Sequence, residues 1–227
     1  SPACLAGLRL CLQRVAAERV ALDLPPSGDS ADSGPISLPT LKLPLSIELG
    51  EVAVGSFLLD GNQQVAELKL AAHWLADGLH IDSLTARGFG LDLALQGRLQ
   101  PSGDWPLQAE ATLGLPAPES KPWKLAVQVG GELQQALTLK GRSSGYLDGS
   151  LEGQLQALAE NLPARLLIRA DGFKGAAGLP DTLTLNAIQL DAGGDLKSGY
   201  LIRGGASLPG EGGAVALSLD LSLIHIS

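Results

Sequence analysis

The chain has no methionine, only 3 Phe, 3 Trp and 2 Tyr residues, and no cluster of positive charge. No apolar run approaches the roughly 20 residues that a membrane-spanning helix needs. A nucleic-acid-binding surface requires a stripe of Lys and Arg, whereas the 16 basic residues here are scattered and the net charge is -8. The composition therefore argues against a nucleic-acid partner, and the missing methionine suggests a section of a longer protein.

Catalytic and metal-binding patterns are also missing. Neither of the two Gly/Ser segments, GSLEG and GASLP, matches the G-x-S-x-G motif of a nucleophilic serine. The glycine clusters lack the following Lys-Ser/Thr pair of a phosphate-binding loop. His73 and His80 are expected at the surface or at an interface rather than in a metal site. The sequence therefore predicts no enzyme, no cofactor and no metal.

Cysteine occurs only twice, as Cys4 and Cys11. If Gly7 and Leu8 form a two-residue hairpin loop, the two cysteines lie directly opposite each other, at a Cα separation of about 5 Å that suits a disulfide. We therefore predict a Cys4–Cys11 disulfide in an oxidising compartment. Two buried free thiols are the alternative. Zinc is less favoured, because no second Cys or His pair stands at ligand spacing.

Leucine at every second position is what the sequence has in abundance, with 29 glycines and 14 prolines punctuating the pattern. Two-residue alternation is typical of strands with one buried face, and it recurs from end to end. We expect an all-β fold of about fourteen to sixteen strands. Only the segment 151–162 also has apolar residues at helical spacing, but Gly153 and Pro163 favour a strand and a turn there.

Glycines recur inside the alternating segments at Gly97, Gly141, Gly153 and Gly204. A glycine within a strand marks a bulge, a bend or the close approach of another group to the backbone. The irregular spacing of these glycines fits no propeller, ankyrin or leucine-rich repeat. The repeating unit is therefore the single strand.

Strands with one apolar face must bury that face against another layer, and almost no helix is available to cover it. The sheet can close on itself, or it can curl strongly into an elongated, open apolar groove. An acyl chain some 20 Å long would cross about four strands of such a groove, and each buried methylene contributes about 0.8 kcal/mol. A leucine-lined groove would hold lipid tails and let them slide. A closed β-sandwich or adhesin-type interaction module is the alternative, with two sheets about 10 Å apart.

The residues expected to line the groove and contact phospholipid acyl chains are apolar residues at alternate positions of the expected strands, assigned to one face by parity alone. They are Leu45, Ile47, Leu49, Leu68, Leu70, Leu91, Leu93, Leu95, Leu107, Leu113, Leu125, Val127, Val129, Leu137, Leu139, Leu166, Ile168, Leu183, Leu185 and Ile202.

A resemblance to a known family is carried by three segments in order. They are CLAGLRLCLQRVAAERVALDLPPS, ISLPTLKLPLSIELGEVAVGSFLLDG and ELKLAAHWLADGLHIDSLTARGFGLDLALQGRLQPSGDWPLQAEATLGLP. Together they resemble the early periplasmic region of the TamB family, in the wider AsmA-like group. The resemblance implies a taco-like β-groove that spans the periplasm and carries phospholipids from the inner to the outer membrane. It also implies a linked role in outer-membrane protein and autotransporter assembly.

The resemblance implies further parts that these residues do not supply. A TamA-like outer-membrane barrel would bind a C-terminal region beyond them, and an inner-membrane anchor helix would precede Ser1. Residues 1–220 are expected to form one section of the periplasmic groove. The last seven residues, LSLIHIS, resemble the translated read-through of a sequencing-library adapter, and residues 221–227 are therefore expected to be non-native.

Overall fold

The computed structural model describes residues 9–22, 36, 38–59, 62–88, 90–117, 121–174, 184–209 and 215–223, which form one sheet of 15 strands and no helix. The strands are β1 (Arg9–Leu12), β2 (Val15–Leu22), β3 (Ser46–Leu59), β4 (Asn62–Val65), β5 (Glu67–Leu75), β6 (Gly78–Gly88), β7 (Leu91–Leu99), β8 (Pro106–Gly114), β9 (Trp123–Glu132), β10 (Leu137–Gly145), β11 (Gly149–Leu155), β12 (Ala164–Lys174), β13 (Thr184–Asp195), β14 (Gly199–Leu208) and β15 (Val215–Leu223).

From β5 to β15 each strand pairs antiparallel with the next one along the chain, so this part of the sheet is a continuous meander of hairpins. The N-terminal end differs, because β1 and β2 follow each other along one edge of β3 and pair with it in parallel. A parallel pair cannot be joined by a tight hairpin, so β2 and β3 need a long connection from one end of the pair to the other.

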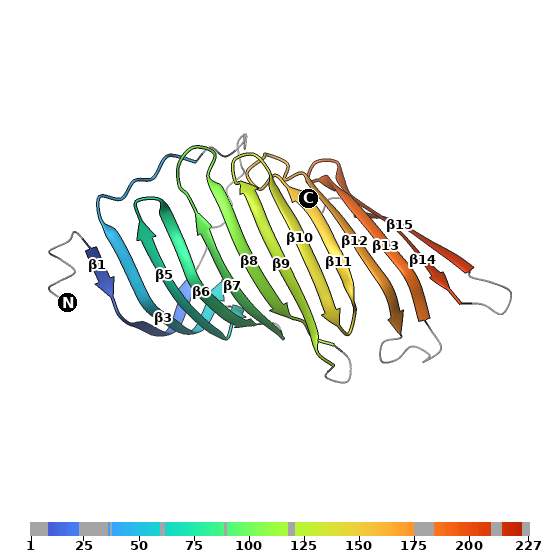
Figure 1. The fold of residues 1–227 in the computed structure, drawn as a ribbon, viewed down its shortest axis with the longest axis horizontal. Coiled ribbons are helices and arrows are strands. Elements are labelled where there is room, and N and C mark those ends of the chain that lie inside the picture. The colour runs from blue at the N-terminus through green and yellow to red at the C-terminus, as the bar shows by residue number, and fades with distance from the viewer. Residues whose placement is uncertain are drawn as a thin grey trace.

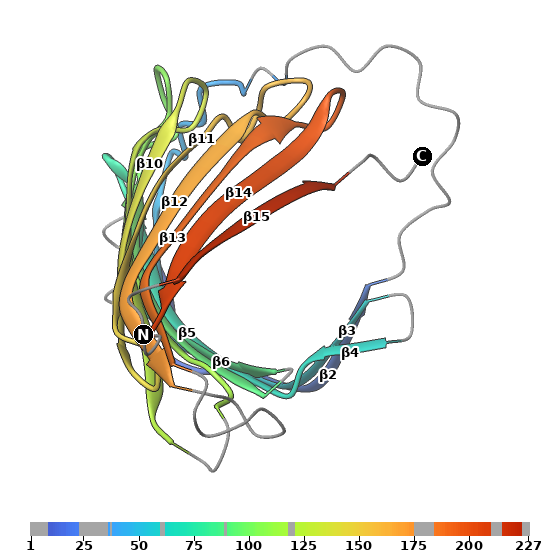
Figure 2. The same ribbon diagram turned by 90° about the vertical axis from the view of Figure 1, so that its right-hand side faces the viewer.

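The sheet is elongated along the strand order and curled across it. Figure 1 shows β1 and β15 at opposite ends of the long axis, and Figure 2 shows the strands bent into a C that stays open on one side. The hydrogen-bonded path runs through 13 strands, which at about 4.8 Å per step gives a groove about 60 Å long. The expected all-β, curled and open groove is confirmed, and the single sheet of the described residues is not a closed sandwich.

The segment 151–162 contains a strand and turns, as expected, since β11 ends at Leu155 and no helix follows it. β15 extends to Leu223 and so includes the first residues of the expected read-through tail. Their origin stays a prediction.

The pairing registers align the apolar residues into continuous rows, because directly paired residues lie on the same face of a sheet. The row that crosses the middle of the sheet contains Leu84, Leu95, Ala111, Val127, Gly141, Leu151, Ile168, Leu190, Gly204 and Leu219. A row on the opposite face contains Gln96, Glu110, Gln128, Lys140 and Glu152. One face of the sheet is therefore apolar and the other polar.

The sheet curls around the apolar face. Alanines on the two faces show this, because their side chains are the same size and differ only in their surroundings. Ala94 and Ala126 on the polar face are exposed, whereas Ala109 and Ala111 on the apolar face are half-buried. Side chains converge on the inside of a curl and diverge on the outside. The apolar face is therefore the inner wall of the C in Figure 2.

The described residues form almost no conventional core. Only four hydrophobic residues among them are buried, namely Ala72, Trp105, Leu137 and Ala170, in addition to Gly78 and Pro101. The chain is nevertheless 45% hydrophobic. Many leucines lie half-exposed on the inner wall, because no second layer of described residues packs against them.

Candidate functional site

The inner wall of the groove is the candidate functional site. The registers bring every predicted lining residue onto this one face except Leu45 and Leu183, which are not among the paired residues. In β7, for example, Leu91, Leu93 and Leu95 alternate with the exposed residues Asp92, Ala94 and Gln96. Their contact with acyl chains stays a prediction, but their shared face is a property of the fold.

Three of these residues need separate comment. Leu45 precedes the first residue of β3 and is 37% exposed, so the leucine alternation begins before the strand does. Leu183 lies outside the described residues. Leu185 lies beyond an irregularity in β13, where Ala187 has a φ of 51° and the register with β14 shifts. Because Asn186 pairs there with Ser207 on the outer face, the shift returns Leu185 to the same face as Ile188.

Several residues of the inner wall were not predicted. They include Leu79, Ile81, Leu84, Leu99, Leu151, Leu155, Ile188 and Leu190. A signal for the last two is present in the sequence: the apolar residues of TLTLNAIQL change from odd to even positions between Leu185 and Ile188. Such a phase change is the sequence mark of an extra residue in a strand.

The inner wall is wide as well as long. β7 presents five successive inward positions, Leu91, Leu93, Leu95, Gly97 and Leu99. At about 3.35 Å per residue these positions span about 27 Å of wall from rim to rim. The wall therefore offers a broad apolar surface rather than a narrow slot shaped for one ligand.

The strand glycines permit close approach on the inner wall. A Cβ at Gly97 would lie 2.7 Å from the Gln108 carbonyl oxygen and 3.0 Å from the Ala109 Cβ. A Cβ at Gly204 would lie 2.3 Å from the Leu190 Cδ2. Glycine at these positions therefore lets neighbouring groups approach closely on the concave side, which is the close-approach role expected of a strand glycine.

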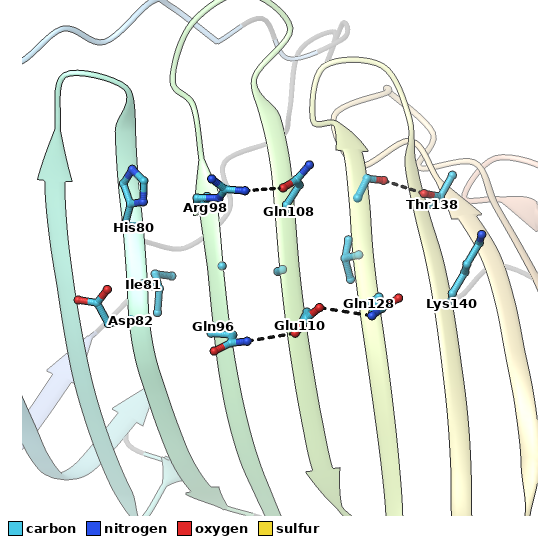
Figure 3. A pocket seen from close by; sticks show the side chains of 14 residues that line it. His80, Ile81, Asp82, Gln96, Arg98, Gln108, Glu110, Gln128, Thr138 and Lys140 are labelled. Carbon is cyan, nitrogen blue, oxygen red and sulfur yellow. Dashed lines mark hydrogen bonds between the residues drawn. The ribbon is translucent and has the colours of Figure 1, made fainter.

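The outer face is a network of polar side chains. Gln96 Nε2 and Gln128 Nε2 both donate to the Glu110 carboxylate, at 3.0 and 3.3 Å, and Arg98 Nη2 donates to Gln108 Oε1 at 3.0 Å (Figure 3). These residues line a shallow depression of about 720 Å³ over β6 to β10. Because its polar groups bond to one another in exposed positions, this depression suits water rather than lipid tails.

The two histidines that stand seven residues apart in the sequence meet on the outer face. The His73 and His80 rings stack with their centroids 4.8 Å apart, and each ring pairs with an aspartate, Asp82 at 2.9 Å and Asp77 at 3.0 Å. The hydrogen bond from His80 is the main cause that lowers the pKa of Asp77. Among the residues that the structure describes, no group of three or more His, Cys, Asp or Glu side chains could hold a metal ion.

An aromatic cluster lies where the β10–β11 turn meets its neighbours. The Tyr146 ring lies 5.5 Å from Trp123 and 5.6 Å from Phe173, measured between centroids. Trp123 Nε1 donates to Ser143 Oγ at 2.8 Å. The cluster ties together three strands at one rim of the groove.

The predicted disulfide falls partly outside the described residues. Cys11 lies in β1 and is not a free thiol, but Cys4 is not among the residues that the structure describes. The Cys4–Cys11 pairing stays a prediction.

Together the fold and the site define a class of protein, an open β-groove with an apolar inner wall and a polar outer face. A family model described as "TamB, N-terminal domain" matches residues 30–222. The chain therefore belongs to the TamB family, as the three resembling segments indicated. No curated protein and no solved structure matches it.

Family membership supports a TamB-like role in lipid transport or assembly at the level of the family. TamB proteins are periplasmic and membrane-anchored as a family. In the part of this chain that the structure describes, no helix has the length and apolar character to span a bilayer.

Proposed function

We propose that this chain is a section of an intermembrane bridge that conducts phospholipids along its apolar groove from the inner to the outer membrane. The observation that carries the proposal is the combination of an unbroken apolar row across the middle of the sheet with only four buried hydrophobic residues, besides Gly78 and Pro101, among those described. So much half-exposed apolar surface is costly in water. Acyl chains lying in the groove would cover it.

The energetics suit a conduit. A sixteen-carbon tail covered by the inner wall gains on the order of 10 kcal/mol before ordering costs are subtracted, at about 0.8 kcal/mol per methylene. The gain comes from area rather than from directed hydrogen bonds, because the row across the middle of the sheet contains only leucine, isoleucine, valine, alanine and glycine. A tail displaced by one strand spacing meets a similar surface, so the barrier to sliding is low.

The proposal also includes the compartment and the partners of the full-length protein. The chain would act in the periplasm, with a linked role in outer-membrane protein and autotransporter assembly. A TamA-like barrel and an inner-membrane anchor would engage parts of the full-length protein other than the groove wall. We propose no catalytic step for the groove.

The test is a photocrosslinking amino acid placed singly at Leu93, Leu139 or Gln96 in the full-length protein, followed by mass spectrometry for attached phospholipid. Leu93 and Leu139 lie on the inner wall, whereas Gln96 is bonded to Glu110 on the outer face. We expect phospholipid adducts at Leu93 and Leu139 and none above background at Gln96. Equal labelling of inner and outer positions would contradict the conduit.

A further inference from the structure

One rim of the groove carries an additional segment of chain. Ile36 and residues 38–45, here called the strap, lie before β3 and run along the hairpin ends (Figure 1, the blue trace above β5 and β6). The strap contacts three successive connections on this rim. The Ile36 N–H donates to the Leu158 carbonyl at 3.0 Å, the Leu41 N–H donates to the Pro101 carbonyl at 2.9 Å, and Gln134 Nε2 donates to the Leu38 carbonyl at 2.9 Å.

The side chains of the strap are mostly apolar. Ile36 is 60% exposed, and Leu41, Leu43 and Leu45 are 46, 45 and 37% exposed. Lys42 is the only charged residue of the strap. The prolines at 39 and 44 lack an N–H group and favour an extended backbone. The strap therefore adds an apolar border to one rim of the groove.

The polar groups of the strapped rim are largely bonded to one another. The Leu133 N–H donates to the Trp105 carbonyl at 3.0 Å, and the Gln134 N–H donates to the Asp104 carbonyl at 3.1 Å. Gln135 Nε2 donates to the Asp104 carboxylate at 2.8 Å. A charged headgroup seated here would have to displace these bonds or lie against the apolar strap, and either is unfavourable.

The opposite rim offers a different surface at the β10–β11 turn. The Trp123 and Tyr146 rings lie there, and Ser143 links the Trp123 indole to the Leu147 carbonyl through hydrogen bonds. Trp and Tyr suit the boundary between apolar and polar surroundings, because each has a large apolar body and one polar group. Asp148 in the same turn accepts a hydrogen bond from the Gly145 N–H at 3.0 Å.

We propose that phospholipids travel in a single orientation, with the phosphate headgroup at the rim of Trp123 and Tyr146 and the strap bordering the tails on the other rim. This inference rests on the proposed function, since it assumes that lipids occupy the groove. It assigns the strap a specific role as the element that excludes headgroups from one rim. The groove then selects the orientation of its guest as well as covering its tails.

The test uses the full chain and two photoreactive phosphatidylcholines, one with a diazirine at the end of an acyl chain and one with a diazirine on the choline headgroup. Crosslinked peptides are mapped by mass spectrometry. The tail probe is expected on β7 and β9. The headgroup probe is expected on residues 145–148 about tenfold more than on the strap and residues 101–105, the factor that a preference of about 1.4 kcal/mol produces.

A strap variant and a matched control separate orientation from general loss of apolar surface. Leu41→Ser with Leu43→Ser should let headgroup labelling spread to residues 101–105 while tail labelling of β7 persists. Leu217→Ser with Leu219→Ser removes two leucines of similar exposure, 42 and 43%, away from the strap, and should leave the rim preference unchanged.

The two proposals fail in different ways. Tail labelling of β7 and β9 with equal headgroup labelling of both rims in the unmodified chain would overturn the orientation and leave the conduit standing. A strap variant that keeps the full rim preference would also overturn the role of the strap. Absence of tail labelling from the inner wall would overturn the conduit, and the orientation with it.

Discussion

The central and terminal strands have the same alternating sequence but not the same burial. In β7 every inward leucine is half-buried, whereas Leu217 and Leu219 of β15 are 42 and 43% exposed and Leu10 of β1 is 41% exposed. A central strand has a paired neighbour on each side, and β1 and β15 have one neighbour each in the described sheet. In the described part of the chain, burial therefore comes from adjacent strands and from the curl, not from an opposing layer.

This difference resembles the energetics of solenoid proteins, in which each unit is stabilised mainly by its two neighbours. A strand at either end of the sheet has no neighbour on one side, so its apolar side chains are more exposed than those of a central strand. A continuous sheet is therefore required for stability, and it is also required for a path along which an acyl chain can slide. The apolar rows contribute to both the stability and the path.

The largest expected effect comes from one substitution made in the centre and at the end of the same apolar row. Leu95→Asp places a charge on the half-buried inner wall, and we expect it to lower the free energy of unfolding by about 2–3 kcal/mol and to block lipid passage. Leu219→Asp in β15 should cost less than about 1 kcal/mol, because that side chain is already 43% exposed. Denaturant midpoints and a lipid-transfer assay measure both effects. Equal destabilisation by the two variants would show that position in the row does not set burial.

A smaller effect is expected from adding one methyl group to either face. Gly97→Ala introduces a Cβ on the inner wall 2.7 Å from the Gln108 carbonyl oxygen, and we expect a loss of about 1–2 kcal/mol. Gly130→Ala is the matched control, because a Cβ there meets no atom within 4 Å, and it should be neutral or stabilise the strand slightly. Thermal melts of the two variants provide the comparison. A neutral Gly97→Ala would mean that the inner wall is not crowded.

The smallest effect concerns an ion pair on the outer face. Arg165 donates to Asp191 at 2.9 Å, and this hydrogen bond is the main cause that lowers the pKa of Asp191 below its ordinary value of 3.8. Since the folded pKa is the lower one, the stabilisation is present above about pH 4 and is lost as the pH falls through the folded pKa. Asp191→Asn should therefore make stability slightly less sensitive to acid, with little change at neutral pH because the pair is exposed. Urea midpoints at neutral and acidic pH test this, and a variant that is more sensitive to acid than the unmodified chain would contradict it.

The sequence allowed the strands and their inward faces to be predicted where alternation is uninterrupted. Leu91 to Leu99 illustrate this, because half-buried and exposed residues alternate at every step and the pairing with β8 has no irregularity. Parity alone does not place Leu45, because Pro44 and the bond from the Leu41 N–H to Pro101 hold that stretch at the rim, which local pattern cannot show. Leu185 shares the inner face with Ile188 only because the irregularity at Ala187 changes the phase of the alternation.

The long-range contacts could not be predicted from periodicity. The parallel pairing of β1 and β2 with β3 depends on where the intervening chain returns, and the strap depends on contacts with residues more than 50 positions away. The two-residue alternation predicts which face the apolar residues share within a strand. It does not predict which rim of the groove a connecting segment follows.

The most direct measurement of the central claim is lipid uptake by the purified, delipidated chain incubated with phosphatidylcholine and phosphatidylethanolamine vesicles and then separated from them. An apolar inner wall that no second layer of described residues covers predicts at least one phospholipid bound per chain, with a large reduction in the Leu95→Asp variant. A chain that stays soluble and monomeric without lipid and takes up none from the vesicles would contradict the account.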